Sequence, residues 1–213
     1  LARRGVKELY IIAQDTTAYG IEKYGRPRLL GLLKELEKVE GIEWMRLLYA
    51  YPDHFGEDLA DFMVASPKMV NYLELPIQHA APSLLRRMNR PNTFELYEKV
   101  FDRLRQANPN FAIRTTVILG FPGETEEEFE FLLNYCKTRR FDRLGAFKYF
   151  REEGTPAARM KDQVPVEVVE ERYHRLMSQQ ADMHFEANEK LIGEDMAFIV
   201  DEVDESGHVA WGR

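Results

Sequence analysis

Five short apolar stretches of this chain each run directly into polar or glycine-rich residues. The groups that follow them are residues 14–17, 51–54, 78–79, 120–125 and 151–157. Their carboxylates, amides, hydroxyls and imidazoles are groups that bind polar ligands. Because the carboxyl ends of parallel strands meet at one edge of a sheet, and ligands bind at that edge, we expect one site assembled from five loops.

Charged side chains lie inside four of the apolar stretches, at Arg46, Glu74, Arg114 and Lys148. A parallel strand covered by helices on both faces is usually apolar throughout. Buried charges must be paired, so these residues either form ion pairs that only hold a barrel together or face a polar ligand in an open barrel. The polar interior favours the second explanation and leaves the first open.

The fourth loop lies in the stretch TTVILGFPGETEEEF, residues 115–129. Thr125 followed three residues later by Glu128 predicts a capping box, and the glutamates between them suit the start of a helix. A helix start crowded with carboxylates disfavours phosphate. We therefore interpret Gly120 and Gly123 as a sharp turn that lies close to a flat or apolar group, such as a nucleobase, with Phe121 as one wall.

Other catalytic motifs are missing from the sequence, which contains neither HExxH nor GxSxG. His54 and His79 are possible metal ligands, although a lone loop histidine is more often hydrogen-bonded or exposed. Cys136, the single cysteine, lies on the apolar stripe of its helix and is predicted to be a core residue. One cysteine also excludes an internal disulfide and a metal site built only from cysteines of this chain.

The elements that position these loops alternate between strands and helices, which is typical of an α/β fold with parallel β/α units. A long helix is predicted after Pro165 and ends at Gly193, and residues 196–211 read as a hairpin with its turn at residues 205–207. We expect a partial barrel at 1–163, the helix at 164–192 and the start of a small β domain at 193–213. The predicted strands are 8–13, 44–50, 72–77, 111–119 and 141–150, and the apolar stripe of the long helix is Val169, Tyr173, Leu176, Gln180, Met183, Ala187 and Leu191.

The 213 residues carry a net charge of −7 and no apolar run long enough for a membrane span. We expect a cytoplasmic protein without membrane association, and direct binding to nucleic acid is not expected from this charge. Arg86, Arg87 and Arg90 are interpreted as one solvated helix face.

Seven motifs, in order, resemble the radical S-adenosylmethionine methylthiotransferases over nearly the whole chain: AQDTTAYG, LLYAYPDHF, YLELPIQHA, LLRRMNRP, VILGFPGETEEEF, FDRLGAFKYFREEGTPAA and KDQVP. Within the family they resemble the RimO-like branch, which modifies a ribosomal protein, more than the MiaB-like branch, which modifies tRNA. The resemblance implies an open (β/α) barrel of the radical SAM type followed by a TRAM-like β domain. It also implies S-adenosylmethionine, two 4Fe-4S clusters, an electron donor, and transfer of a methylthio group to the β-carbon of an aspartate in ribosomal protein S-twelve of the small subunit.

The family's CxxxCxxC motif is absent from this sequence. Three thiolates are needed to hold a cluster with one iron open to the cofactor. We therefore expect a fragment that holds barrel strands two to six, is inactive alone, and contains no metal ligands or assigned catalytic residues.

The resemblance also implies which residues bind the cofactor. The end of the first predicted strand contacts its methionine part, the third and fourth strands face its ribose and carboxylate, and the GFPG loop and two aromatic residues surround adenine. These residues are Gln14, Asp15, Thr16 and Thr17; Glu74, Gln78, Arg114 and Thr116; Leu119, Gly120, Phe121 and Gly123; and Phe147 and Tyr149.

Two other functions stay open at this point. One is a tRNA methylthiotransferase, although residues 191–212 contain six acidic residues and no lysine or arginine, which disfavours RNA: Glu194, Asp195, Asp201, Glu202, Asp204 and Glu205. The other is a non-catalytic binding barrel, which fits the missing cysteines but not the density of polar groups at the loops.

Overall fold

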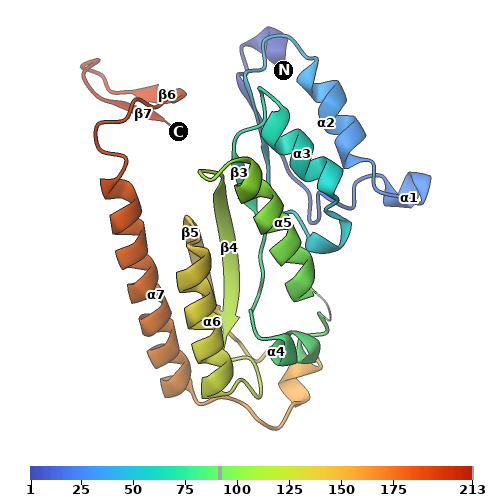
Figure 1. Cartoon of the computed structure of the whole chain (residues 1–213), viewed down its shortest axis with the longest axis vertical. Helices are drawn as coiled ribbons and strands as arrows, with labels where there is room; N and C mark the ends of the chain where they lie inside the picture. The colour runs from blue at the N-terminus through green and yellow to red at the C-terminus, as the bar shows by residue number, and fades with distance from the viewer. Residues whose placement is uncertain (91–92, 213) are drawn as a thin grey trace.

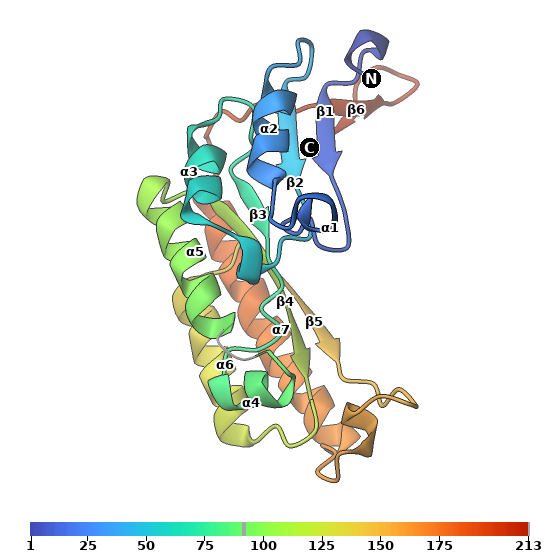
Figure 2. The same cartoon turned by 90° about the vertical axis from the view of Figure 1, so that its right-hand side faces the viewer.

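A computed structural model describes residues 1–90 and 93–212 of the chain. Five parallel strands follow one another across the molecule (Figures 1 and 2). They pair as β1 with β2 and as β3 with β4 and β5. A single bridge between Met45 and Met69, and a hydrogen bond of 3.2 Å from the Ala50 amide to the Glu74 carbonyl, connect the two groups. All five predicted strands are present, each shorter than expected: β1 (Glu8–Ile11), β2 (Trp44–Leu47), β3 (Tyr72–Glu74), β4 (Ala112–Leu119) and β5 (Arg143–Lys148).

The connections between the strands are mainly helical, as the alternating pattern predicts. Figure 2 shows α2, α3, α5 and α6 on one side of the strands. The helices are α1 (Ile21–Tyr24), α2 (Leu29–Glu37), α3 (Glu57–Ala65), α4 (Pro82–Arg87), α5 (Thr93–Ala107), α6 (Glu126–Arg139) and α7 (Val166–Glu189), with 3-10 turns η1 (Ala2–Arg4), η2 (Pro52–His54) and η3 (Ala157–Arg159).

The hydrophobic core lies between the strands and these helices. Alternate strand residues point to opposite faces of a sheet, and one set of alternate residues is buried. Leu47, Leu73, Val117 and Leu119 all have 0% of their surface exposed. We call this the covered face of the sheet, and the opposite side the open face.

The start of α6 has the predicted capping box. The Glu128 amide donates to Thr125 Oγ1 at 3.2 Å, and the Thr125 amide donates to Glu128 Oε2 at 3.1 Å. Cys136 of the same helix is fully buried, and burial raises the pKa of its thiol to about 12. Its predicted place in the core is confirmed.

The long helix α7 packs against β5, β4 and α6, and its buried residues include Val169, Leu176, Gln180 and Met183. The predicted stripe extends too far, because α7 ends at Glu189 and Leu191 lies beyond it with 48% of its surface exposed.

After α7 the chain forms an antiparallel hairpin from β6 (Val200–Val203) and β7 (Ala210–Gly212). The hairpin is confirmed, and all residues of both strands are exposed. Its membership of a small β domain stays a prediction, as do the other proposed boundaries.

Within the described ranges, no helix has both the length and the apolar character of a membrane span. The motif LLRRMNRP ends at Pro91, and the proposed small β domain ends at Arg213; both of these residues lie outside the described ranges.

Candidate cofactor-binding site

The open face of the sheet carries the charged strand residues. The pairing places Tyr10 beside Arg46 and Glu74 beside Arg114, so these side chains share one face. Arg46 Nε donates to Glu8 Oε1 at 2.9 Å, where the Glu8 side chain is 1% exposed. The Arg46 guanidinium also lies 5.6 Å from the Tyr10 ring and 5.0 Å from the Tyr72 ring. Pairing within the protein therefore explains Arg46.

Arg114 differs from Arg46 because its guanidinium is half open to solvent. Its Nε lies 3.9 Å from Glu74 Oε2, and its side chain is 51% exposed. Tyr72 donates to the same glutamate oxygen at 3.4 Å, and burial, followed by the Glu74 charge, raises the pKa of Tyr72. Arg114 also hydrogen-bonds Tyr72, and because its pair with Glu74 is long and its side chain is half exposed, guanidinium donors remain for a ligand on the open face.

Lys148 does not belong to this group, and for this residue the ion-pair alternative holds. Its amine pairs with Glu170 of α7 at 2.5 Å and lies 4.6 Å from the Tyr173 ring. Strand residues alternate, so its neighbour Phe147 takes the open face, where 67% of its surface is exposed.

The loop after β1 is held to the end of β2 by three of the predicted site residues. Thr16 Oγ1 donates to the Leu48 carbonyl at 2.9 Å, Thr17 Oγ1 donates to Asp15 Oδ1 at 2.5 Å, and the Thr17 amide donates to the same oxygen at 2.9 Å. Both threonines are buried. These three side chains therefore build the loop, and only Gln14 is exposed for direct contact.

Gln78 follows β3 in the left-handed region, with φ 66°. Hydrogen bonds from its amide to the Thr116 carbonyl (2.9 Å) and from the Ile118 amide to its own carbonyl (2.8 Å) hold it there. A non-glycine residue pays about 1 kcal/mol or more for this conformation, and such residues cluster at functional sites. Gln78 thus lies next to Thr116, which is on the open face with Arg114.

The glycines of the fourth loop make close contacts with protein. Gly120 has φ 76°, and a Cβ there would lie 2.3 Å from Cγ2 of Val169 in α7. Gly123 has φ 78°; its amide donates to the Asp162 carbonyl at 2.6 Å, and its carbonyl accepts from Arg87 at 2.9 Å. The sharp turn and a close approach to an apolar group, Val169, are confirmed at Gly120; contact of this loop with a nucleobase stays a prediction.

The apolar residues near this loop are mostly packed inside the protein. Leu119 is fully buried on the covered face, so only its backbone could flank a ligand on the open face, and its role beside adenine stays a prediction. Phe121 is 9% exposed and packs with Ala81 and Leu84. Tyr149 meets it edge-on with 5.5 Å between ring centroids. Phe121 and Tyr149 therefore support the loop, and Phe147 is the open aromatic ring.

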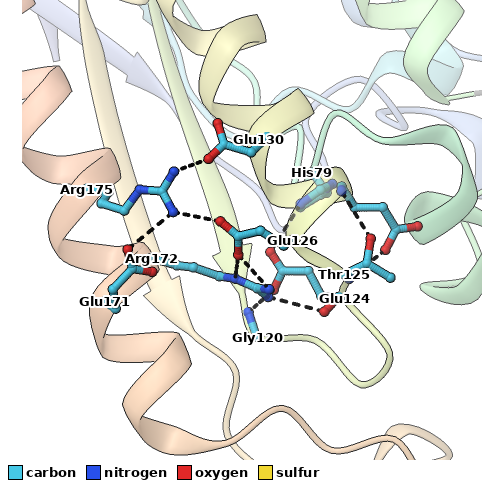
Figure 3. Close-up of polar contacts among 10 residues, drawn as sticks. His79, Gly120, Glu124, Thr125, Glu126, Glu130, Glu171, Arg172 and Arg175 are labelled. Atoms are coloured by element: carbon cyan, nitrogen blue, oxygen red, sulfur yellow. Dashed lines mark hydrogen bonds and ion pairs between the residues drawn. The ribbon is translucent and has the colours of Figure 1, made fainter.

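A buried charge network lies directly beneath the loop (Figure 3). The Glu124 side chain, 0% exposed, accepts from the Gly120 amide. Its other oxygen is 3.5 Å from Nε2 of the equally buried His79, and Arg172 of α7 lies 3.5 Å away. Nδ1 of His79 accepts from the Ala81 amide at 3.0 Å, which leaves Nε2 as the protonated nitrogen facing Glu124. The network ties the end of β3, the loop and α7 together.

The acids at the start of α6 extend this network. Arg172 and Arg175 both pair with Glu126, at 3.1 and 2.7 Å, and hydrogen bonds from Arg175 lower the pKa of Glu126. Burial raises the pKa of Glu128, but hydrogen bonds from Ser83, from the Thr125 amide and from Arg87 outweigh it, so the net shift is downward. The predicted helix start is confirmed, and it also docks α7.

Sequence reasoning missed the central member of the network, Glu124, because the glutamates were read together as a helix start. The signal was the position of Glu124, which precedes the cap residue Thr125 and therefore lies outside the helix. Arg172 was also missed, although it falls on the same helix face as Val169 and Leu176. His79 is hydrogen-bonded within the protein, as the sequence analysis favoured over a metal-ligand role.

A family model for the Radical SAM superfamily matches residues 1–136. The chain belongs to this superfamily. It is 47% identical over 202 residues to a protein of Desulfitobacterium hafniense named ribosomal protein uS12 methylthiotransferase RimO, covering 95% of this chain and 45% of that protein. The protein of the same name from Moorella thermoacetica is 50% identical over 199 residues, which are 93% of this chain and 46% of that protein. The sequence is therefore RimO-like, and it spans about half the length of these curated relatives.

Solved structures support the fold. Coproporphyrinogen III oxidase from Escherichia coli, a radical SAM enzyme, superposes with a TM-score of 0.63 at 21% identity and covers 84% of this chain and 41% of that chain. At this identity the likeness shows the fold alone.

The residues present fit part of the family's cofactor set. Arg114, Thr116 and Gln78 offer donors and acceptors on an open face, as S-adenosylmethionine requires. An iron–sulfur cluster does not fit this chain, because Cys136 is buried in α6 and the described residues contain no group of three metal-binding side chains.

Proposed function

We propose that this chain forms the cofactor- and substrate-facing part of a methylthiotransferase that modifies an aspartate of ribosomal protein uS12. The proposal is supported by the RimO-like sequence and by the open face of a parallel sheet that ends in five polar loops. S-adenosylmethionine, with a cluster whose thiolates this chain does not contain, would supply the species that removes a hydrogen atom from the target β-carbon.

Arg114 carries the proposal. Its guanidinium is half exposed and only loosely paired with Glu74 at 3.9 Å, so it can bind the carboxylate of the cofactor's methionine part. Thr116 and Gln78, held side by side at the ends of β4 and β3, would hydrogen-bond the ribose or the amino group. Phe147 would cover the adenine, and Gln14 would reach the methionine end.

The remaining predicted cofactor residues take supporting roles in this proposal. Asp15, Thr16 and Thr17 set the position of Gln14, while Glu74 orients Arg114. Gly120, Phe121, Gly123 and Tyr149 shape the fourth loop through packing. Leu119 contributes only the backbone carbonyl that accepts from the Tyr149 amide at 2.7 Å.

Substrate and partners follow from the same proposal. The relatives are named for uS12, a protein of the small ribosomal subunit, so the enzyme would act in the cytoplasm and require an electron donor. The acidic segment that contains β6 and β7, a proposed start of a TRAM-like domain, suits a basic protein partner better than RNA. Full-length enzyme that modifies tRNA and leaves uS12 unmodified would contradict this assignment.

The cofactor role is tested by equilibrium binding of S-adenosylmethionine to the full-length enzyme with its clusters reconstituted. We expect Arg114→Gln to raise the Kd about tenfold, since a hydrogen bond to a charged group is lost. Arg103→Gln is the matched control, because Arg103 pairs with Asp61 on the outer helices and its loss should leave the Kd unchanged. Equal affinities for Arg114→Gln and the wild type would overturn the assignment.

A further inference from the structure

Two arginines, Arg151 and Arg159, line a hollow at the carboxyl edge of the sheet. The segment after β5 forms a hollow of about 460 Å³ bordered by Arg151, Glu153, Gly154, Ala158 and Arg159. In Figures 1 and 2 this orange segment lies at the end of the molecule next to α4, where the β4 arrow points. It is therefore on the same edge as the fourth loop.

The hollow has a fixed wall, since the segment is held by its own hydrogen bonds. The Ala158 amide donates to Thr155 Oγ1 at 3.2 Å, and Thr155 Oγ1 donates to the Glu152 carbonyl at 2.8 Å. Ala157 and Met160 pack against the cluster that contains Phe121. The segment is thus anchored to the fourth loop, and the hollow keeps its place relative to the open face.

The two arginines have donors left over. Arg151 Nε donates to the Ala158 carbonyl at 2.9 Å, which orients the side chain but engages only one of its nitrogens. Within the described residues, no hydrogen bond or ion pair engages the terminal nitrogens of Arg151 or the guanidinium nitrogens of Arg159; the Arg159 amide donates to the Pro156 carbonyl at 3.1 Å. Most other arginines of the sheet and of α6 and α7 are paired, so the hollow presents a concentration of unused guanidinium donors.

The charge of the hollow selects the type of ligand. Two arginines and one glutamate, Glu153, leave a single net positive charge in the hollow, which one carboxylate neutralises. A guanidinium also matches a carboxylate in bidentate geometry. A polyanion such as an RNA backbone is disfavoured by Glu153 and the adjacent exposed Glu152.

We infer that Arg151 and Arg159 bind the side-chain carboxylate of the aspartate that is modified. This inference rests on the proposed function. In aspartate the carboxylate is attached directly to the β-carbon, so fixing the carboxylate fixes the carbon that loses hydrogen. Arg114 and the hollow then serve different carboxylates, that of the cofactor and that of the substrate.

The test is a double-mutant cycle on peptide binding to the full-length reconstituted enzyme. The probes are a fluorescently labelled uS12 peptide that contains the target aspartate and the same peptide with asparagine at that position. Arg159→Gln is the main variant because the Arg159 side chain makes none of the hydrogen bonds that hold the segment. We expect it to raise the Kd of the aspartate peptide about tenfold and to leave the Kd of the asparagine peptide unchanged. Arg159→Lys keeps the positive charge but loses the planar guanidinium that binds a carboxylate through two hydrogen bonds. The Kd of the aspartate peptide for this variant should lie between those of the wild type and Arg159→Gln.

Arg86→Gln is the matched control, since Arg86 is an exposed arginine of α4 and does not border the hollow. It should leave both Kd values unchanged. Equal losses for both peptides with Arg159→Gln, or no loss for either, would overturn the inference. If the wild type binds neither peptide, the proposed function fails, and the inference fails with it; a wild type that binds both peptides equally tightly overturns the inference alone.

Discussion

The two faces of the β1–β5 sheet use the same strands in opposite ways. On the covered face, Leu73, Val117 and Leu119 are fully buried beneath helices. On the open face, Tyr10 and Phe147 are 40% and 67% exposed, and Arg46 and Arg114 pair with Glu8 and Glu74 of the strands. The covered face therefore accounts for stability, and the open face remains available for binding.

Thr115 and Thr116 show this difference within one dipeptide. Thr115, on the covered face, is 0% exposed and donates to the Leu75 carbonyl at 2.9 Å while accepting from the Ile77 amide at 3.2 Å. Thr116, on the open face, is only partly buried. Side-chain chemistry is the same at both positions, so the tertiary surroundings alone assign one to structure and the other to a site.

The largest expected effect is at Gly120, where the covered side is packed most tightly. Gly120→Ala should destabilise the chain by about 4 kcal/mol, because the new methyl group meets Val169 and the positive φ adds strain. Gly25→Ala is the control: Gly25 also has a positive φ, but nothing lies within 4 Å of its Cβ position, and its cost should be about 1 kcal/mol. Chemical unfolding measures both, and similar costs would show that strain, not packing against α7, determines the result.

The adjacent threonines give the next largest effect. Thr115→Val should cost about 2 kcal/mol, because the buried Ile77 amide loses its acceptor. Thr116→Val should change the free energy of unfolding by less than about 0.5 kcal/mol. Urea unfolding of the two variants compares the faces directly, and equal costs would remove the distinction drawn between them.

A smaller effect is expected from pH, through the acids that dock α6. The folded-state pKa of Glu128 lies below its ordinary value of 4.5, so its contribution to stability is complete above that value and is lost as pH falls through the folded pKa. The free energy of unfolding should therefore decline below about pH 4.5, and less steeply in Glu128→Gln. Parallel pH curves for the variant and the wild type would contradict this role.

The smallest effect concerns Cys136, whose thiol is buried and has its pKa raised to about 12. Iodoacetamide at mildly alkaline pH should label it only as fast as the chain unfolds. A cysteine introduced by Phe131→Cys on the same helix, where Phe131 is 46% exposed, should react like a free thiol. Rapid labelling of Cys136 in the wild type would mean that the covered face opens readily.

Much of the fold could be predicted from the sequence, because strand and helix periodicities are local. The five strands, the capping box at Thr125 and Glu128, the core position of Cys136 and the final hairpin follow from patterns within a few residues. The face of the sheet on which an individual side chain lies was harder to predict. The sequence left open whether Lys148 pairs within the protein or faces a ligand, because one residue of register decides the face.

The candidate site stays a prediction, and the structure adds packing contacts for several of its residues that the sequence did not indicate. Gly120 does mark a close approach, yet its partner, Val169, is 49 residues away in the sequence. Glu124 and Arg172, which hold the loop, are equally distant in sequence. Such contacts leave no local pattern, so the sequence alone could not separate packing from ligand binding.

The sequence by itself determined the family, the order of strands and helices, and the edge at which the loops gather, since all of these depend on motifs and short-range periodicity. Only the tertiary structure decided which charged side chains are paired within the protein and which remain available to a ligand. Arg46 is paired with the buried Glu8, whereas Arg114, Arg151 and Arg159 retain guanidinium donors. The physical reason is that a charge is available to a ligand only when no residue from a distant part of the chain already satisfies it.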